Sequence, residues 1–185
     1  MNHQADDKII IEQILNGDKQ AYTLLVKRYQ QKVFRLCMGF MHNPDDAADL
    51  TQEVFIKAYQ KLSTYKGDSK FSTWLYRVSV NMAINSQRKQ KIRATFNFYD
   101  NGNETQQIAD TRYADENINE LEQKQMVKKI LDSLPASQRK AIVLSHYEEL
   151  SNKELAEVMG LSVKASESLL YRARSNMQKM IKKQK

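Results

Sequence analysis

The sequence predicts an all-α protein made of two small helical domains joined by a flexible acidic linker. Apolar residues recur at the three- and four-residue spacing of amphipathic helices, and no stretch sustains the alternation typical of a β-strand. Only five glycines and two prolines interrupt these patterns in 185 residues. Basic residues gather on either side of an acidic segment, which divides the chain into domains 1–93 and 118–185 around a linker over 94–117.

The charge distribution also indicates a class of ligand. The net charge of +7 and the pI of about 9.3 are consistent with nucleic-acid binding. Residues 67–93 contain six basic residues and one acidic residue, whereas residues 94–122 contain one basic and seven acidic. The single cysteine excludes an internal disulfide, the N-terminus is too polar for a signal peptide, and no apolar run has the length of a membrane span. We therefore expect a cytoplasmic protein without direct membrane insertion.

Three helices are expected before the first basic segment. A short one covers 6–15, and a long one covers 18–41 with Cys37 on its apolar stripe, as a buried structural thiol. The third follows the N-cap residue Asn43 and runs to Leu62. One side of this third helix carries a row of polar side chains and an isoleucine: Asp45, Asp49, Gln52, Glu53 and Ile56.

This row admits three interpretations from the residues alone. It can be solvated charge, a docking face for a basic partner helix, or a metal-binding cluster of the kind that nucleases use. Because Asp45, Asp49 and Glu53 belong to one helix, they line up along its face and do not converge on one ion, so we favour docking. The three histidines lack ligand spacing, and we expect no metal or other cofactor.

The segment from Phe71 to Arg93 is a candidate nucleic-acid site. Its apolar stripe comprises Phe71, Trp74, Leu75, Val78 and Met82. A second row beside this stripe consists of Arg77, Asn81 and Arg88, and the helix ends with further cations that include Lys91. A polar loop with Tyr65, Asp68 and Ser69 precedes it. A helix that is fixed by one face and cationic on the next is suited to bind nucleic acid, although a solvated surface helix remains the alternative.

Four helices are expected in the second domain, and the last two form a helix-turn-helix. Pro135 ends the first, and the second covers 137–147. Ser151 and Glu154 form a capping box for a short helix that ends at Gly160. On the fourth helix, five residues are expected to face inward: Val163, Leu170, Ala173, Met177 and Ile181. Five others form the expected DNA-contacting row: Lys164, Ser168, Tyr171, Arg172 and Ser175.

Four stretches in order along the chain, 17–29, 46–59, 65–81 and 134–174, carry a resemblance to a known family. They resemble the extracytoplasmic-function (ECF) sigma factors, which are bacterial transcription initiation factors without catalytic activity of their own. The third stretch, YKGDSKFSTWLYRVSVN, is the most specific of the four. The resemblance implies a sigma-two domain and a sigma-four domain, with core RNA polymerase, promoter DNA and an anti-sigma factor as partners.

The resemblance also implies roles for the candidate residues. The helix at 45–62 would dock on core RNA polymerase. The loop and helix over 65–93 would bind the promoter −10 element as a single strand with a flipped base. Residues implied at that site are Tyr65, Asp68, Ser69, Phe71, Trp74, Arg77, Asn81, Arg88 and Lys91. The helix at 162–182 would enter the major groove of the −35 element.

The chain departs from the family pattern in its last helix. Ser166 stands where a buried valine is usual, and Glu167 and Leu169 replace typical cations, so phosphate contacts there are expected to be weaker. Two other functions are weighed against a sigma factor: an ordinary helix-turn-helix regulator and a metal-dependent nuclease. The first leaves the acidic helix face and acidic linker unexplained, and the second lacks ligand spacing.

Overall fold

The computed structural model describes residues 3–100, 118–147 and 150–183, and every regular element within these ranges is helical. The N-terminal module contains α1 (His3–Leu15), α2 (Tyr22–Met41), α3 (Pro44–Lys61), α4 (Phe71–Asp100) and two 3₁₀ turns at Lys19–Ala21 and Leu62–Thr64. The C-terminal module contains α5 (Ile118–Ser133), α6 (Ala136–Tyr147), α7 (Asn152–Met159) and α8 (Val163–Lys183). The expected all-α fold is confirmed. Within the described ranges, no helix combines the length and apolar character that a bilayer crossing requires.

Several helix ends form where the sequence predicts them, because short-range hydrogen bonds decide them. The Asn43 side chain accepts from the Asp46 N–H at 2.9 Å, and Pro44 begins α3. Ser151 and Glu154 form the expected capping box of α7, and Gly160 ends that helix at φ 67°. The start of α2 differs: Asp18 caps a 3₁₀ turn, and the α-helix begins at Tyr22.

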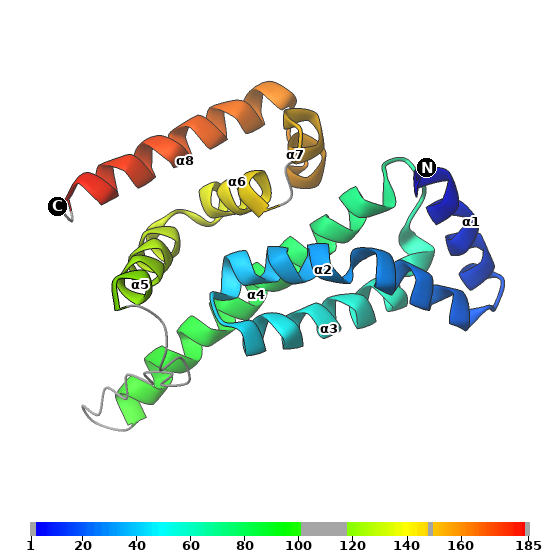
Figure 1. Ribbon diagram of the computed structural model, residues 1–185, viewed down its shortest axis with the longest axis horizontal. Helices are drawn as coiled ribbons and strands as arrows, with labels where there is room; N and C mark the ends of the chain where they lie inside the picture. The colour runs from blue at the N-terminus through cyan, green and yellow to red at the C-terminus, as the bar shows by residue number, and fades with distance from the viewer. Residues whose placement is uncertain (1–2, 101–117, 148–149, 184–185) are drawn as a thin grey trace.

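Helices α2, α3 and α4 lie side by side and α1 crosses one end of them (Figure 1). Their shared core includes Leu25, Val33, Phe40, Val54 and Leu75, each with at most 1% of its surface exposed. Cys37 is also fully buried in this core, as expected, and its burial raises the pKa of the thiol to about 11.

The buried face of α4 differs from the predicted stripe. Phe71 and Leu75 are buried, but Trp74, Val78 and Met82 are only half-buried. The most deeply buried side continues instead through Tyr76, Ser79, Val80, Ala83 and Gln87. The pattern failed because α4 packs on α2 and α3 along one side and on α7 along another. The helix also continues to Asp100, past the expected linker start at residue 94; residues 101–117 of that linker lie outside the described ranges.

Two inward-facing assignments on α8 were wrong. Val163 and Ile181 are 41% and 36% exposed, because they lie near the ends of the helix. Leu170 and Ala173 are buried as expected, together with Ser166 and Leu169.

The two modules pack against each other, an arrangement that the sequence did not predict. Figure 1 shows α6 beside α2 and α7 beside the N-terminal part of α4. Buried residues of both modules belong to one continuous apolar cluster, in which Val143, Leu155 and Leu169 join the core residues of α2 and α4. Helices α6, α7 and α8 therefore share one apolar core with the N-terminal module.

Candidate nucleic-acid interface

A cluster of aromatic rings stands at the start of α4 and supports the loop before it. Phe71 and Trp74 stack with ring centroids 5.6 Å apart, and Tyr65 contacts both rings at 5.7 Å. Phe71 is 1% exposed and forms the floor of the cluster, whereas Tyr65 and Trp74 are half-buried. The half-buried rings offer the stacking surface that an unpaired base needs, and Phe71 does not.

The loop between Tyr65 and Lys70 presents polar atoms beside these rings. The Tyr65 hydroxyl donates to the Ser69 carbonyl at 2.6 Å, which closes the loop on the cluster. Asp68 is exposed and Ser69 half-exposed. Gly67 turns the chain at φ 78°, a conformation that a side chain disfavours. Carboxylate and hydroxyl groups beside an aromatic surface are suited to hydrogen-bond the edge of an extruded base.

The predicted cationic row on α4 has two environments in the structure: one part is exposed, and the other contacts the C-terminal module. Arg88 is exposed, as expected, and the Lys91 side chain lies outside the described residues. Arg77 and Asn81 also point to the surface, but both contact the C-terminal module. Arg77 donates to the Glu157 carbonyl, and Lys140 donates to Asn81 Oδ1 at 3.4 Å.

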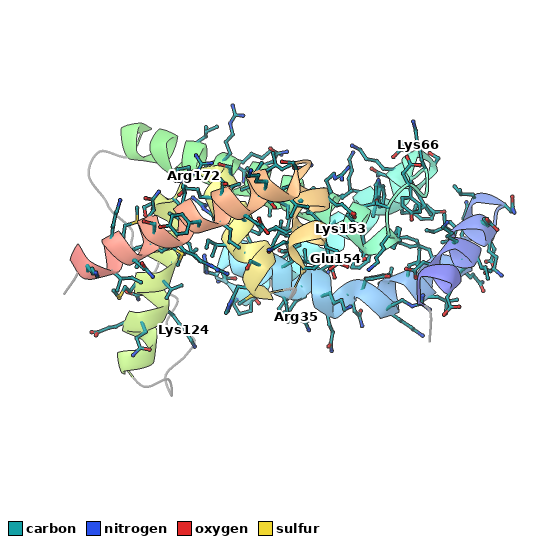
Figure 2. The ribbon with its side chains drawn as sticks, turned by 90° about the horizontal axis from the view of Figure 1, so that it is seen from above. Arg35, Lys66, Lys124, Lys153, Glu154 and Arg172 are labelled. Carbon is teal, nitrogen blue, oxygen red and sulfur yellow. The ribbon has the colours of Figure 1, made fainter. Side chains whose placement is uncertain are left out.

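A salt bridge links the loop to the first helix of the helix-turn-helix. Lys70 Nζ lies 2.8 Å from Glu154 Oε1. The Lys70 contact and the bonds from Ser151 hold the pKa of Glu154 below its usual value, while partial burial opposes them. In the view of Figure 2, Glu154 and Lys153 lie on α7 between Arg172 on α8 and Lys66 in the loop. One carboxylate thus caps α7 and contacts the candidate site.

A buried polar network crosses the module interface further along α4. Gln87 donates to the Phe40 carbonyl at the end of α2 and accepts from Arg139 on α6. Arg139 also bonds the Asp132 carboxylate at 3.1 Å and its carbonyl at 2.8 Å. Arg139 is 5% exposed, and its burial lowers the pKa of the guanidinium. Nothing in the sequence pattern indicated Gln87 or Arg139, because the hydrogen bond between them joins residues 52 positions apart in the chain.

A cavity of about 430 Å³ lies between the modules. Val80 and Ile84 line it from α4, and Met159 and Leu161 from the helix-turn-helix. Arg77, Asn81 and Lys140 also line it. The candidate DNA face of α4 is therefore partly covered by the C-terminal module.

The acidic row of α3 is exposed along its whole length, since Asp45, Asp49, Gln52, Glu53 and Ile56 all face the surface. Ile56 is 60% exposed. Among the described side chains, no group of His, Cys, Asp and Glu has the arrangement of a metal site. The row therefore lies on the surface, where a partner protein can reach it.

Helix α8 presents the predicted row to the surface. Lys164, Ser168, Tyr171 and Arg172 are exposed, and Ser175 is half-buried. Leu169 is 8% exposed, so it packs in the core and does not replace a cation on the outer face of α8. Glu167 accepts from the Asn152 amide at 2.8 Å and is tied to α7. The exposed row of α8 therefore consists of basic and polar side chains, with Tyr171 among them, and these are the residue types that contact bases and phosphates in a major groove.

Comparisons with known families match both modules. Residues 25–92 match Sigma-70 region 2, and residues 124–177 match Sigma-70, region 4. The chain is 36% identical to the ECF RNA polymerase sigma-E factor of Escherichia coli K12, over 94% of this chain and 93% of that protein. It is 32% identical to the RNA polymerase sigma-H factor of Pseudomonas aeruginosa PAO1, over 96% and 95%.

Two solved structures share the fold. CnrH in complex with the cytosolic domain of CnrY matches with a TM-score of 0.68 and 25% identity, over 97% of this chain and 99% of CnrH. The sigma factor RpoE of Bartonella quintana, in complex with the anti-sigma factor NepR, matches with a TM-score of 0.59 and 20% identity, over 87% and 96%.

Proposed function

The chain belongs to the ECF sigma factors of the sigma-70 family, and from this premise we propose which of its residues read a promoter. Sigma factors are non-enzymatic proteins that bind core RNA polymerase and direct it to promoters, and region 2 binds the −10 element. The region 2 and region 4 matches fall within the proposed domain limits of 1–93 and 118–185, with the linker over 94–117.

The −10 element binds to the loop before α4 and to the adjoining face of α4. The observation that carries this proposal is the cluster of half-buried rings beside exposed polar atoms. Tyr65 and Trp74 stack against an extruded base, and Asp68 and Ser69 hydrogen-bond its edge. Arg77, Asn81, Arg88 and Lys91 hold the strand, and Phe71 supports the rings from below.

The −35 element binds to α8. Lys164, Ser168, Tyr171, Arg172 and Ser175 lie along its outer face, and Tyr171 is 76% exposed. Their contacts are made in the major groove, as in other helix-turn-helix proteins. With Leu169 buried and Glu167 bound to Asn152, the phosphate contacts fall to Lys164 and Arg172.

Core RNA polymerase docks on the exposed α3 row. Asp49 lies in the middle of that row, so Asp49→Arg is expected to weaken polymerase binding about fivefold, on the order of 1 kcal/mol, as for one exposed charge contact. Titration of labelled core polymerase measures this change. Asp6→Arg, an equal charge reversal on the exposed side of α1, is the matched control. Equal affinity for both variants would contradict docking on α3.

An anti-sigma factor is the remaining partner. The RpoE structure of B. quintana contains the anti-sigma factor NepR, and CnrH was solved with the cytosolic domain of CnrY. We extend that kind of partner to this chain, and we place the chain in the cytoplasm, where transcription occurs.

Transcription with purified core polymerase tests the function directly. Genomic fragments of the host are incubated with core polymerase and the chain, and initiated transcripts are sequenced. We expect start sites that share upstream elements and that disappear without the chain. Duplex binding without any initiation would instead support an ordinary helix-turn-helix regulator.

A further inference from the structure

A buried carboxylate of the first helix lies behind the aromatic cluster of the proposed −10 site. Asp7 belongs to α1 and is 3% exposed. The region 2 match begins at residue 25, so α1 precedes it. A buried carboxylate is costly unless charge and hydrogen bonds compensate it, and its presence here requires an explanation.

Two residues of α2 provide that compensation. Arg28 pairs with Asp7 Oδ1 through its guanidinium, and the Tyr29 hydroxyl donates to Asp7 Oδ2. Burial raises the pKa of Tyr29, and the bond to Asp7 adds to that effect, so the hydroxyl stays protonated and keeps donating. The Asp7 carboxylate thereby fixes the position of the Tyr29 hydroxyl.

Tyr29 connects this carboxylate to the rings of the proposed site. Its ring meets Phe71 edge to face, with centroids 5.5 Å apart. Phe71 in turn stacks on Trp74 and contacts Tyr65. Asp7 also lies close enough to Tyr65 for its charge to raise the pKa of that phenol, after the larger effect of burial. One hydrogen bond and two successive ring contacts therefore connect α1 to Tyr65 and Trp74, the residues proposed to hold the base.

We propose that Asp7 is a positioning residue for −10 recognition: its hydrogen bond to Tyr29 fixes Phe71, and Phe71 fixes the Tyr65 and Trp74 rings that hold the extruded base. This role rests on the proposed function. It differs from simple anchoring of α1, because anchoring predicts a loss of stability alone, whereas positioning predicts altered rings and altered base selection in a folded protein.

Trp74 provides a direct measurement, since it is the only tryptophan in the chain. Acrylamide quenching of its fluorescence, measured without DNA, reports how firmly the cluster packs. Asp7→Ala removes both interactions, and Tyr29→Phe removes the hydroxyl but keeps the ring. Asp7→Asn keeps an acceptor for Tyr29 but loses the charge. We expect more quenching in Asp7→Ala and Tyr29→Phe, and a smaller increase in Asp7→Asn.

Base selection is measured with holoenzyme assembled from each variant and core polymerase. The probe is a pool of short single-stranded DNA of random sequence, and retained molecules are sequenced. We expect several-fold lower base enrichment for Asp7→Ala and Tyr29→Phe than for the wild type. Leu36→Ala, a cavity substitution elsewhere in the α2 core, controls for lost stability and should retain both quenching and enrichment.

The outcomes separate this role from the proposed function. Wild-type quenching and wild-type enrichment in Asp7→Ala and Tyr29→Phe would overturn the role and leave the −10 site intact. Equal losses in Leu36→Ala would also overturn it, because general destabilisation would then explain the effect. A wild-type holoenzyme that selects no bases would overturn the proposed −10 site itself, and the role with it.

Discussion

His42 illustrates how one residue at the junction of regions 2 and 4 responds to pH. It ends α2 in the left-handed conformation at φ 55°, and its buried Nε2 has no hydrogen-bond partner among the described residues. Burial lowers the pKa of His42, Lys128 and Arg139 lower it further, and Asp132 opposes them. The sequence did not reveal this site, because these neighbours lie in helices far along the chain.

A pH dependence of stability follows from this lowered pKa. The native structure favours neutral His42, so its contribution is complete above the unfolded-state pKa of about 6.5 and is lost as pH falls through the lower native value. We expect the melting temperature to fall as the pH is lowered from about 7.5 to about 5. His42→Asn should reduce this fall, since Asn tolerates the left-handed backbone and does not titrate. Thermal scans across pH measure both proteins, and identical slopes would rule out His42 as the cause.

At the scale of the element, the turn of the helix-turn-helix depends on Gly160. Its φ of 67° disfavours any side chain, yet a Cβ there would meet no atom within 4 Å. The cost of Gly160→Ala is therefore backbone strain alone, about 1 kcal/mol. Thermal unfolding should show this loss, and Gly160→Asn should lose less. A larger loss in Asn than in Ala would contradict the role of the left-handed backbone.

Helix limits could be predicted where a local signal defines them, but helix faces were predicted less well. Asn43, Ser151 and Gly160 end or begin helices through bonds within a few residues, which the sequence displays directly. The buried side of α4 depends on which helices lie against it, and α7 was not expected there. The outer row of α8 was predicted correctly. Val163 and Ile181 were assigned to the inner face, but they lie near the ends of the helix and are exposed.

At the scale of the whole molecule, the contact between regions 2 and 4 covers part of the proposed −10 site. Arg77 and Asn81 belong to the proposed −10 site and contact region 4 in this structure. If Arg77 and Asn81 bind the −10 strand as proposed, region 4 must first leave α4. The apparent affinity of the free protein for the −10 strand is then reduced by the fraction of molecules in which region 4 still covers α4. The sequence predicted both modules but not their contact, which joins apolar and polar side chains that lie far apart in the chain.

The Lys70–Glu154 salt bridge provides a test of this effect on affinity. Glu154→Gln keeps an acceptor for the α7 cap but removes the charge that pairs with Lys70. Because an exposed ion pair contributes about 0.2–1 kcal/mol, we expect the free protein to bind the −10 strand up to about fivefold more tightly. Fluorescence anisotropy with the strand found by transcription measures this change.

Glu167→Gln is the matched control for this substitution. It removes the same charge from the same region and can still accept from Asn152. We expect its affinity for the −10 strand to equal that of the wild type. An equal gain in affinity in both variants would indicate a general charge effect and would contradict a specific role of the Lys70–Glu154 salt bridge.

The single cysteine of the chain offers an independent view of the region 2 core. Cys37 has no exposed surface, and its thiolate is disfavoured by the raised pKa. A thiol reagent in solution can therefore modify it only when the surrounding helices transiently separate. The labelling rate therefore measures how often those openings occur, because it depends on their equilibrium population when reclosing is fast. Binding of core polymerase to α3 should lower the labelling rate, because a bound partner stabilises the native bundle.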